Sequence, residues 1–463
     1  MIDSSAQPQA GYDTATKRRW SMQNRAVVSG ALGSALEWFD FGVYGALSAT
    51  LFPQLFFAEL GPAGAAMASF ATFGVGFLAR PLGGIVFGHL GDRFGRRPIL
   101  LATFITMGLA SALIGLLPVN GSFEVALCLV LLRFIQGFSL GGEVTGAQLM
   151  TLEHAKGNSR GIRGALMNVG SPFSQVLANL VLLLLSASLT AEQFAQWGWR
   201  IPFVGGLLLV ALGIYIRLKL QETPIFVAAS RTKTGNRLGL GVLVSQPRTV
   251  LTLVLVWAAP VTVFYVIAVY GLAYLIEVAG FDRSSAFLVT MVGNAVSVVF
   301  TLLGGWVSDR IGRRPVLFIG YAGCFIGVAS FVPASASGSL LPVILSVTLT
   351  LSAALFQFGA QPAFFAEQFP TRTRFAGSAL ALTLSGVLFA APAPLVATIF
   401  SNAGEPRLIF WVVCALNVGS AVALLCLKAR SEELMVNDDE AAAGRELLPD
   451  ADEAAESSSE VRV

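Results

Sequence analysis

Long apolar stretches alternate with short polar segments along almost the whole chain. A helix that crosses a bilayer needs about 20 mostly apolar residues. Breaks rich in polar residues, Gly or Pro separate stretches of that length at residues 27–51, 64–88, 98–117, 124–150, 162–186, 201–220, 249–276, 285–307, 315–333, 340–364, 376–400 and 407–427. The pattern therefore predicts an all-α membrane protein with twelve transmembrane helices.

Lys and Arg are distributed unevenly over the predicted loops. If the N-terminus lies in the cytoplasm, every Lys and Arg falls on the cytoplasmic side except Arg80 and Arg133, within spans, and Arg200, Arg283 and Arg407, on the other side. Basic residues concentrate in cytoplasmic loops of membrane proteins. A wrong helix count would destroy this asymmetry, so we expect both termini in the cytoplasm of a bacterial inner membrane protein.

The composition agrees with a lipid environment. Hydrophobic residues make up 55% of the chain, charged residues only 12%, and the mean hydropathy is +0.72. A soluble domain carries about 25% charged residues, so a soluble enzyme is excluded. The net charge of +3 does not indicate a nucleic-acid partner. The four cysteines lie singly, so we expect no metal site and no cofactor.

Polar segments divide the chain into five predicted parts. Residues 1–26 are basic, and we expect no signal peptide there; residues 429–463 form an acidic tail with a composition typical of disorder. Between them we expect a six-helix bundle over 27–220, a cytoplasmic linker over 221–248 and a second six-helix bundle over 249–428.

Two copies of one motif indicate an internal duplication. Residues 88–98 read GHLGDRFGRRP and residues 305–315 read GWVSDRIGRRP, each between the second and third spans of its half. A second pair of segments, beginning at Glu153 and Glu367, follows the fourth span of each half. Matched loops at matched positions predict two pseudo-symmetric halves, as in transporters with repeated bundles.

The motif Gly-x-x-x-Asp-Arg-x-Gly-Arg-Arg resembles the cytoplasmic loop motif of the major facilitator superfamily. Further segments resemble its metabolite–proton symporter branch, which includes proline/betaine, citrate, oxoglutarate and shikimate symporters. They are GSALEWFDFGVYG at 33–45, ARPLGG at 79–84, RFIQGFSLGGEVTGA at 133–147, WGWRIPF at 197–203, ETP at 222–224 and EQFPTRTR at 367–374. The eleventh span departs from that branch, with Leu382–Thr383 where many members have Tyr-Asn.

The resemblance implies a gating role for the charged loop residues. Carboxylates at the ends of spans can meet a helix N-terminus or an arginine and hold the two halves together. The alternative is a basic loop that only fixes topology. The candidate gating residues are Asp92, Arg93, Arg96, Arg97, Glu153, Asp309, Arg310, Arg313, Arg314 and Glu367.

Ionisable residues inside predicted spans need a reason, because each costs about 2.5–3.5 kcal/mol or more in lipid. Glu37 and Asp40 share one face of the first span, and Tyr44 lies on it too. Two carboxylates this close in low dielectric do not ionise together easily. One of them can then take up and release a proton, as proton coupling requires. The alternative is that both are held ionised by Arg80 or Arg133.

The buried arginines indicate an anionic substrate. The planar guanidinium of arginine pairs well with carboxylates. Arg133 is the better candidate to bind a substrate carboxylate, because Arg80 can belong to machinery that carriers of different substrates share. Arg133 can equally be a structural partner of Asp40 or Glu143. Glu143 follows two glycines that let another helix approach, so it can relay a proton or pair with an arginine.

Softer polar positions complete the candidate site. Asn168, Gln175, Tyr270 and Gln357 lie within spans and either line a cavity or make hydrogen bonds between helices.

The sequence therefore predicts a secondary active transporter, not an enzyme. We expect proton-coupled symport of a small organic acid by a monomer. The alternatives are a proline or betaine symporter, an exporter or antiporter, and a nutrient sensor without flux. The chain lacks a Gly-x-x-x-x-Gly-Lys-Ser/Thr loop, which argues against ATP as the energy source.

Overall fold

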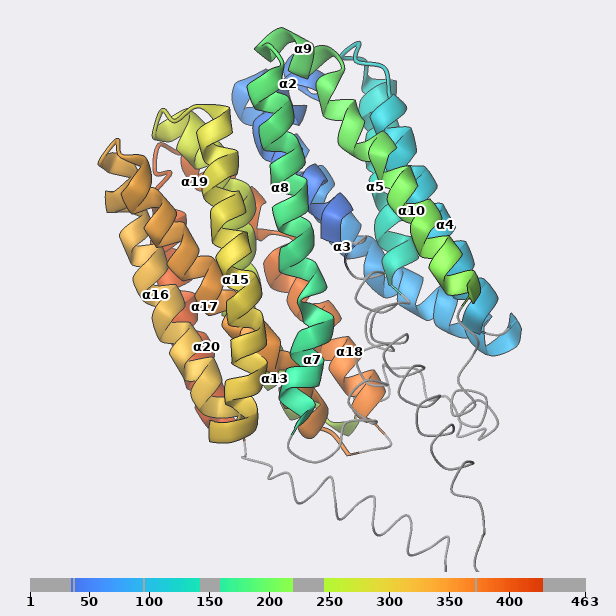
Figure 1. Cartoon of the computed structure of the whole chain (residues 1–463), viewed down its shortest axis with the longest axis vertical. Coiled ribbons are helices and arrows are strands. Elements are labelled where there is room, and N and C mark those ends of the chain that lie inside the picture. The colour runs from blue at the N-terminus through green and yellow to red at the C-terminus, as the bar shows by residue number, and fades with distance from the viewer. Residues whose placement is uncertain are drawn as a thin grey trace, which may run out of the picture.

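The computed structural model describes residues 35, 38–94, 96–141, 159–219, 245–370 and 373–427, and the regular elements among them are all helices (Figure 1). A helical segment over residues 38–50 comes first. It is followed by α2 (Phe52–Phe56), η1 (Ala58–Leu60), α3 (Gly61–Phe94), α4 (Arg96–Leu116), α5 (Phe123–Leu140), α7 (Arg160–Asn168), α8 (Gly170–Ser188), α9 (Ala191–Gln196), η3 (Gly198–Arg200) and α10 (Ile201–Lys219).

The second part of the chain has the same helical character. Its elements are α13 (Pro247–Tyr265), the π-helical η4 (Val266–Tyr270), α14 (Gly271–Ala273), the π-helical η5 (Tyr274–Val278), α15 (Arg283–Ile311), α16 (Arg313–Ala336), α17 (Leu340–Glu367), α18 (Arg374–Ser385), the π-helical η6 (Gly386–Ala390), α19 (Ala393–Asn402) and α20 (Leu408–Cys426).

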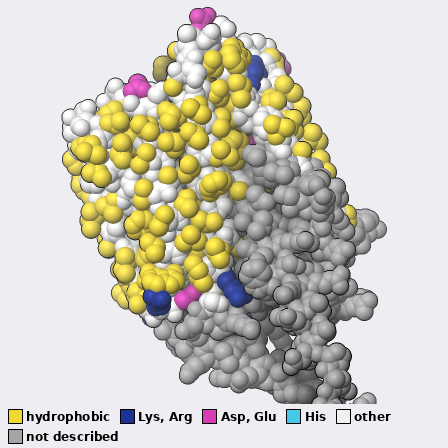
Figure 2. Space-filling model, viewed as in Figure 1, with side chains coloured by type: hydrophobic (Ala, Val, Ile, Leu, Met, Phe, Trp, Pro, Cys, Tyr) yellow, Lys and Arg dark blue, Asp and Glu magenta, His cyan; other side chains and the backbone are white. Residues whose placement is uncertain are grey.

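Nine helices among the described residues are long and apolar enough to cross a membrane, and Leu101–Leu116 forms a shorter apolar helix. The helical segment 38–50 and α10 lie at two further predicted spans. On the face shown in Figure 2, hydrophobic side chains cover most of the described surface, and the charged ones gather toward its two ends. This distribution fits a belt of lipid around the bundle.

Proline lies inside one predicted span without ending it. The expected stretch 162–186 is confirmed as one span, Arg160–Ser188, in which α7 and α8 meet at Val169 with its backbone still in the α-helical conformation. Pro172 has no N–H, so the carbonyl of Asn168 loses the donor that a continuous helix would supply. Asn168 therefore lies within one continuous span, four residues before its proline.

Close helix contacts depend on glycine at two matched places. A Cβ on Gly83 of α3 would lie 1.7 Å from the carbonyl oxygen of Phe138 in α5. A Cβ on Gly359 of α17 would lie 2.0 Å from the carbonyl oxygen of Thr301 in α15. Small residues let helices approach in membranes, so these contacts fix the helices that carry the candidate site.

Candidate functional site

Asp40 lies in a polar cluster built from three helices. Its Oδ2 accepts a hydrogen bond from Nε2 of Gln136 in α5 at 2.7 Å, and its Oδ1 accepts one from the hydroxyl of Ser111 in α4. Nη1 of Arg133, also in α5, lies 3.9 Å from Oδ2 of Asp40. The carboxylate is buried, so these donors replace the water it would have outside the membrane.

Arg133 is completely buried beside this carboxylate. Its Nη1 donates to Oε1 of Gln136 at 3.1 Å, so Gln136 bridges the arginine and the aspartate. The Nε and Nη2 groups of Arg133 make no hydrogen bond within the described part of the chain. A buried N–H without an acceptor is costly, so this edge of the guanidinium can bind an incoming anion.

Aromatic rings surround the same guanidinium. The central carbon of Arg133 lies 4.0 Å from the ring centre of Phe41, 4.2 Å from that of Tyr44 and 5.3 Å from that of Phe73. Rings at this distance stabilise a cation through their π faces. Gly76 leaves the space, since a Cβ there would lie 3.0 Å from Nε of Arg133.

Arg80 shares one of these rings. Its guanidinium carbon lies 4.5 Å from the ring centre of Phe41 and 4.9 Å from that of Phe77, and its side chain is half-buried. Two arginines therefore stand around Phe41. Glu37 and Glu143, the other two predicted proton-coupling residues, lie outside the described residues.

Rings from the second half of the chain close over this cluster. Tyr265 lies 5.7 Å from Phe73 and 5.2 Å from Phe77, measured between ring centres. Trp38 lies 6.3 Å from Phe264 and 6.4 Å from Phe358. The charged cluster is thus on one half and its aromatic cover on the other.

The remaining predicted substrate residues make contacts of different kinds. Nε2 of Gln175 donates to the carbonyl of Trp38 at 3.1 Å, the hydroxyl of Tyr270 donates to the carbonyl of Pro406 at 3.3 Å, and Nε2 of Gln357 lies 3.7 Å from Sγ of Cys324. In each of these contacts both partners belong to the same half of the chain: the first half for Gln175, and the second half for Tyr270 and Gln357. Asn168 differs, because its Nδ2 donates to the carbonyl of Phe358 in the other half at 2.8 Å.

A second polar cluster joins the halves at the end of α15. The two carboxylate oxygens of Asp309 accept from the backbone N–H groups of Gly161 and Ile162, at 2.7 and 2.9 Å, in the first turn of α7. Nη1 of Arg313 lies 2.6 Å from Asp309, and its Nε lies 3.1 Å from Oε1 of Glu367. A carboxylate at a helix N-terminus complements the helix dipole.

The other predicted gating residues have separate contacts or are not described. Arg310 is exposed, with its guanidinium carbon 3.5 Å from the ring centre of Trp306, and Nη2 of Arg314 donates to the carbonyl of Leu424 at 3.3 Å. Glu153 and the side chains of Asp92, Arg93, Arg96 and Arg97 lie outside the described part of the chain.

The halves also touch at the opposite end. Arg283 donates to the carbonyl of Thr50 at 3.3 Å, and the hydroxyls of Ser186 and Ser284 lie 3.0 Å apart. Contacts at both ends, with aromatic rings between them, enclose the Asp40–Arg133 cluster in the described part of the molecule.

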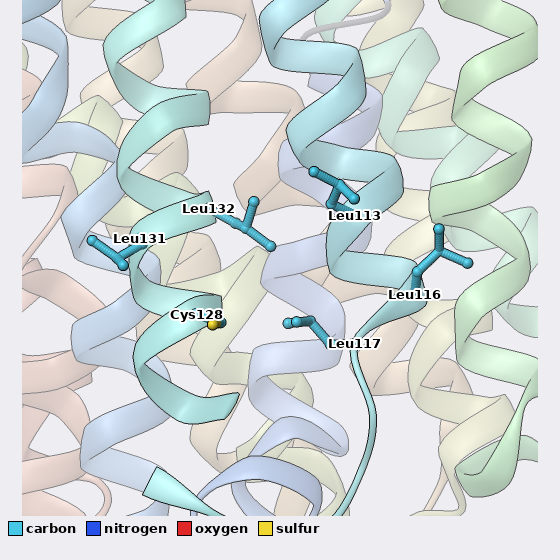
Figure 3. Close-up of a pocket in the computed structure, with 6 residues that line it drawn as sticks. All are labelled: Leu113, Leu116, Leu117, Cys128, Leu131 and Leu132. Atoms are coloured by element: carbon cyan, nitrogen blue, oxygen red, sulfur yellow. The ribbon is translucent and has the colours of Figure 1, made fainter. Parts of the chain in front are cut away.

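An apolar pocket of about 350 Å³ lies away from this cluster, between α4 and α5 (Figure 3). Its lining is Leu113, Leu116, Leu117, Cys128, Leu131 and Leu132. Such a surface offers no partner for a polar substrate, so we do not assign it to the transport site.

Sequence reasoning missed two members of the site, Ser111 and Gln136. Gln136 was detectable, because it lies three residues after Arg133 and therefore on the same helix face. Ser111 carries no such signal, since serine is common in transmembrane helices.

Comparison with known proteins agrees with this architecture. The model of the Major Facilitator Superfamily matches residues 30–392. The inner membrane metabolite transport protein YhjE of Escherichia coli is 35% identical over 383 residues, which cover 81% of this chain and 87% of YhjE. The shikimate transporter of Escherichia coli is 32% identical, covering 81% and 87%. The proline/betaine transporter of Salmonella typhimurium is 34% identical, covering 81% and 77%.

A solved structure supports the fold independently. The partially occluded inward open conformation of the xylose transporter XylE from E. coli superposes with a TM-score of 0.72 at 20% identity, covering 89% of this chain and 99% of that chain. These matches are to transporters and not to enzymes, and they share the twelve-helix architecture of two pseudo-symmetric bundles. The chain therefore belongs to the major facilitator superfamily and is a membrane transporter of its metabolite symporter branch.

Proposed function

We propose that this transporter carries a small carboxylate-bearing substrate together with a proton, by alternating access across the bacterial inner membrane. Both termini and the Asp309 end of the bundle lie in the cytoplasm in this proposal. The observation that carries it is the buried Arg133, whose Nε and Nη2 groups lack an acceptor within the described residues while Asp40 lies 3.9 Å from Nη1.

Proton and substrate binding are coupled through this pair. When Asp40 is ionised, it attracts Arg133 and accepts from Gln136 and Ser111. Protonation of Asp40 removes the charge opposite Arg133, so the guanidinium can pair fully with a substrate carboxylate. Loss of the proton restores the internal pair and weakens the hold on the substrate. Binding of one ligand thereby favours binding of the other.

Alternating access follows from the contacts between halves. The two six-helix parts, 27–220 and 249–428, would rock around the central cluster, with the Asp309 cluster closing the cytoplasmic end. The Asp309 carboxylate accepts hydrogen bonds from two backbone N–H groups, and such a contact can form and break reversibly. It would be made when that end is closed and broken when it opens.

The experiment is uptake into proteoliposomes across a panel of mono-, di- and tricarboxylates and zwitterions, with and without an inward proton gradient. We expect at least one carboxylate to accumulate only when the gradient is present. Uptake of every accepted substrate at the same level without a gradient would refute proton coupling.

A second candidate is symport of a betaine or proline. The rings of Phe41, Tyr44 and Phe73 around Arg133 favour it, because aromatic faces attract quaternary ammonium groups. A zwitterion would place its carboxylate on Arg133 and its ammonium group against the rings. Relatives named proline/betaine transporters are consistent with this reading. Uptake of betaine in preference to all carboxylates in the same panel would select it.

A further inference from the structure

Prolines inside two helices leave carbonyl groups that other helices bind. Proline has no N–H, so the carbonyl four residues earlier loses its helical donor. Pro260 of α13 leaves the carbonyl of Val256, which accepts from the hydroxyl of Tyr321 at 2.6 Å. Pro362 of α17 leaves the carbonyl of Phe358, which accepts from Nδ2 of Asn168 at 2.8 Å. Each carbonyl has thus gained a donor from a side chain.

The two bonds differ in what they connect. Tyr321 lies in α16, within the same half as α13, so its bond persists when the halves move as units. Asn168 is the last residue of α7, in the first half, whereas Phe358 belongs to the second. The Asn168 bond must therefore break whenever α7 leaves α17.

The surroundings of Asn168 place it on a continuous contact between halves. The first turn of α7 is bound by Asp309, and Gly164 in its middle faces Pro362, where an added Cβ would lie 3.1 Å from the Cβ of that proline. Asn168 ends α7, where α7 continues into α8 through Val169. One helix of nine residues thus meets the second half from its start to its end.

We propose that Asn168 is a positioning residue for alternating access, which stabilises the state with α7 on α17 by donating to the carbonyl that Pro362 frees. The proposal rests on the alternating access of the proposed function and gives Asn168 a role between halves in place of a direct contact with substrate. When this end opens, the Phe358 carbonyl becomes an acceptor that water reaches.

The test measures opening without substrate. Ser308→Cys provides the reporter, because Ser308 is 1% exposed and its Oγ would lie 2.4 Å from a Cβ on Gly161 of α7. The four native cysteines are replaced by alanine, and a membrane-impermeant thiol reagent labels the purified protein. We expect Asn168→Ala to raise the labelling rate about fivefold, the factor that one typical hydrogen bond contributes.

A double-mutant cycle separates this bond from general loosening. Pro362→Ala supplies an N–H that can donate to the Phe358 carbonyl, so Asn168 becomes redundant. In that background we expect Asn168→Ala to change labelling less than about twofold. Asn179→Ala is the matched control, because Nδ2 of Asn179 donates to the carbonyl of Gln175 in its own half at 2.8 Å. It should leave labelling within about twofold of the parent.

Three results would overturn the proposal: an equal increase from Asn168→Ala in both backgrounds, no increase in either, or parental labelling in Asn168→Leu, which keeps the bulk but lacks the donor. The leucine variant keeps the test decisive if Pro362→Ala fails to fold. Labelling requires neither substrate nor a proton gradient, so failure of wild-type proton-driven uptake would refute the proposed function without touching this result.

Discussion

At the scale of single residues, the proposed chemistry depends on how Asp40 is solvated. The carboxylate is buried, but Ser111 and Gln136 donate to it and the guanidinium of Arg133 lies nearby. This environment accommodates the ionised form, because the donors replace water. A proton can still be taken up, because the 3.9 Å separation from Arg133 is longer than a direct hydrogen bond.

Replacing the carboxylate should uncouple transport from the proton. Asp40→Asn keeps the shape and an acceptor for Gln136, but it cannot gain or lose a proton. We expect gradient-driven accumulation to fall from about tenfold per pH unit to none, while exchange of labelled for unlabelled substrate persists. Proteoliposome uptake and counterflow measure the two. Accumulation by the Asn variant at the wild-type level would contradict the role of Asp40.

Changing the cation tests substrate binding. Arg133→Lys keeps the charge but loses the planar edge formed by Nε and Nη2. We expect the apparent affinity for a carboxylate substrate to weaken about tenfold or more, the effect of losing one charge-assisted hydrogen bond. Competition uptake measures it.

The matched control for this change is Arg310→Lys, since Arg310 is exposed and stacks on Trp306, away from the Asp40–Arg133 cluster. Equal affinity in the parent and both lysine variants would remove Arg133 from the substrate site.

At the scale of helices, stability depends on backbone approach. Gly359 lets α17 lie against α15, where a Cβ would meet the carbonyl oxygen of Thr301 at 2.0 Å. The contact is with backbone, which cannot rotate away as a side chain can. The same contact holds Phe358 and Gln357 in place, so helix packing and site geometry depend on one another.

Filling this contact should destabilise the protein. We expect Gly359→Ala to lower the free energy of unfolding by about 1–3 kcal/mol, the usual cost of overpacking. The control is Gly419→Ala in α20, where nothing lies within 4 Å of an added Cβ. Thermal unfolding in detergent compares them. A Tm for Gly359→Ala equal to or above that of the control would show that the two helices can separate without cost.

At the scale of the whole molecule, the Asp309 cluster ties one half to the other through a buried carboxylate. Asp309→Asn removes the negative charge from the α7 N-terminus and from Arg313. We expect net uptake to fall about tenfold while the protein stays folded, because the closed state at that end loses a charge-assisted bond. Uptake, together with size-exclusion chromatography, checks this.

The same helix offers a matched control at its other end. Asp282 caps α15 by accepting from the backbone N–H of Ser285 at 2.9 Å, and the Ser285 side-chain and backbone hydrogen bonds lower the pKa of this carboxyl. Asparagine caps a helix as well as aspartate does, so Asp282→Asn should keep wild-type uptake. If both variants lose uptake equally, the loss reflects α15 itself and not the contact between halves.

The apolar periodicity of the sequence was sufficient to predict the helices, but not to predict which helices pack against one another. The sequence was sufficient to predict the spans, the repeated loop motif and a possible pairing of Asp40 with Arg133. Each of these depends on residues close in sequence or on a single pairing of charges. Ser111 could not be predicted, since nothing local shows which helix α4 faces. The bond from Asn168 to Phe358 depends on how two halves meet, which no single segment encodes.

The described members of the charged cluster, Asp40, Ser111, Arg133 and Gln136, all belong to the first half of the chain. Proton coupling and recognition of the substrate carboxylate can then be inherited together, while the second bundle changes. A lineage that alters the second bundle can acquire a new carboxylate-bearing nutrient while it keeps the first-half residues that couple transport to the proton. Chimaeras that exchange residues 249–428 with those of a relative should accordingly keep the proton coupling and the requirement for a carboxylate, and change the preference for the rest of the substrate.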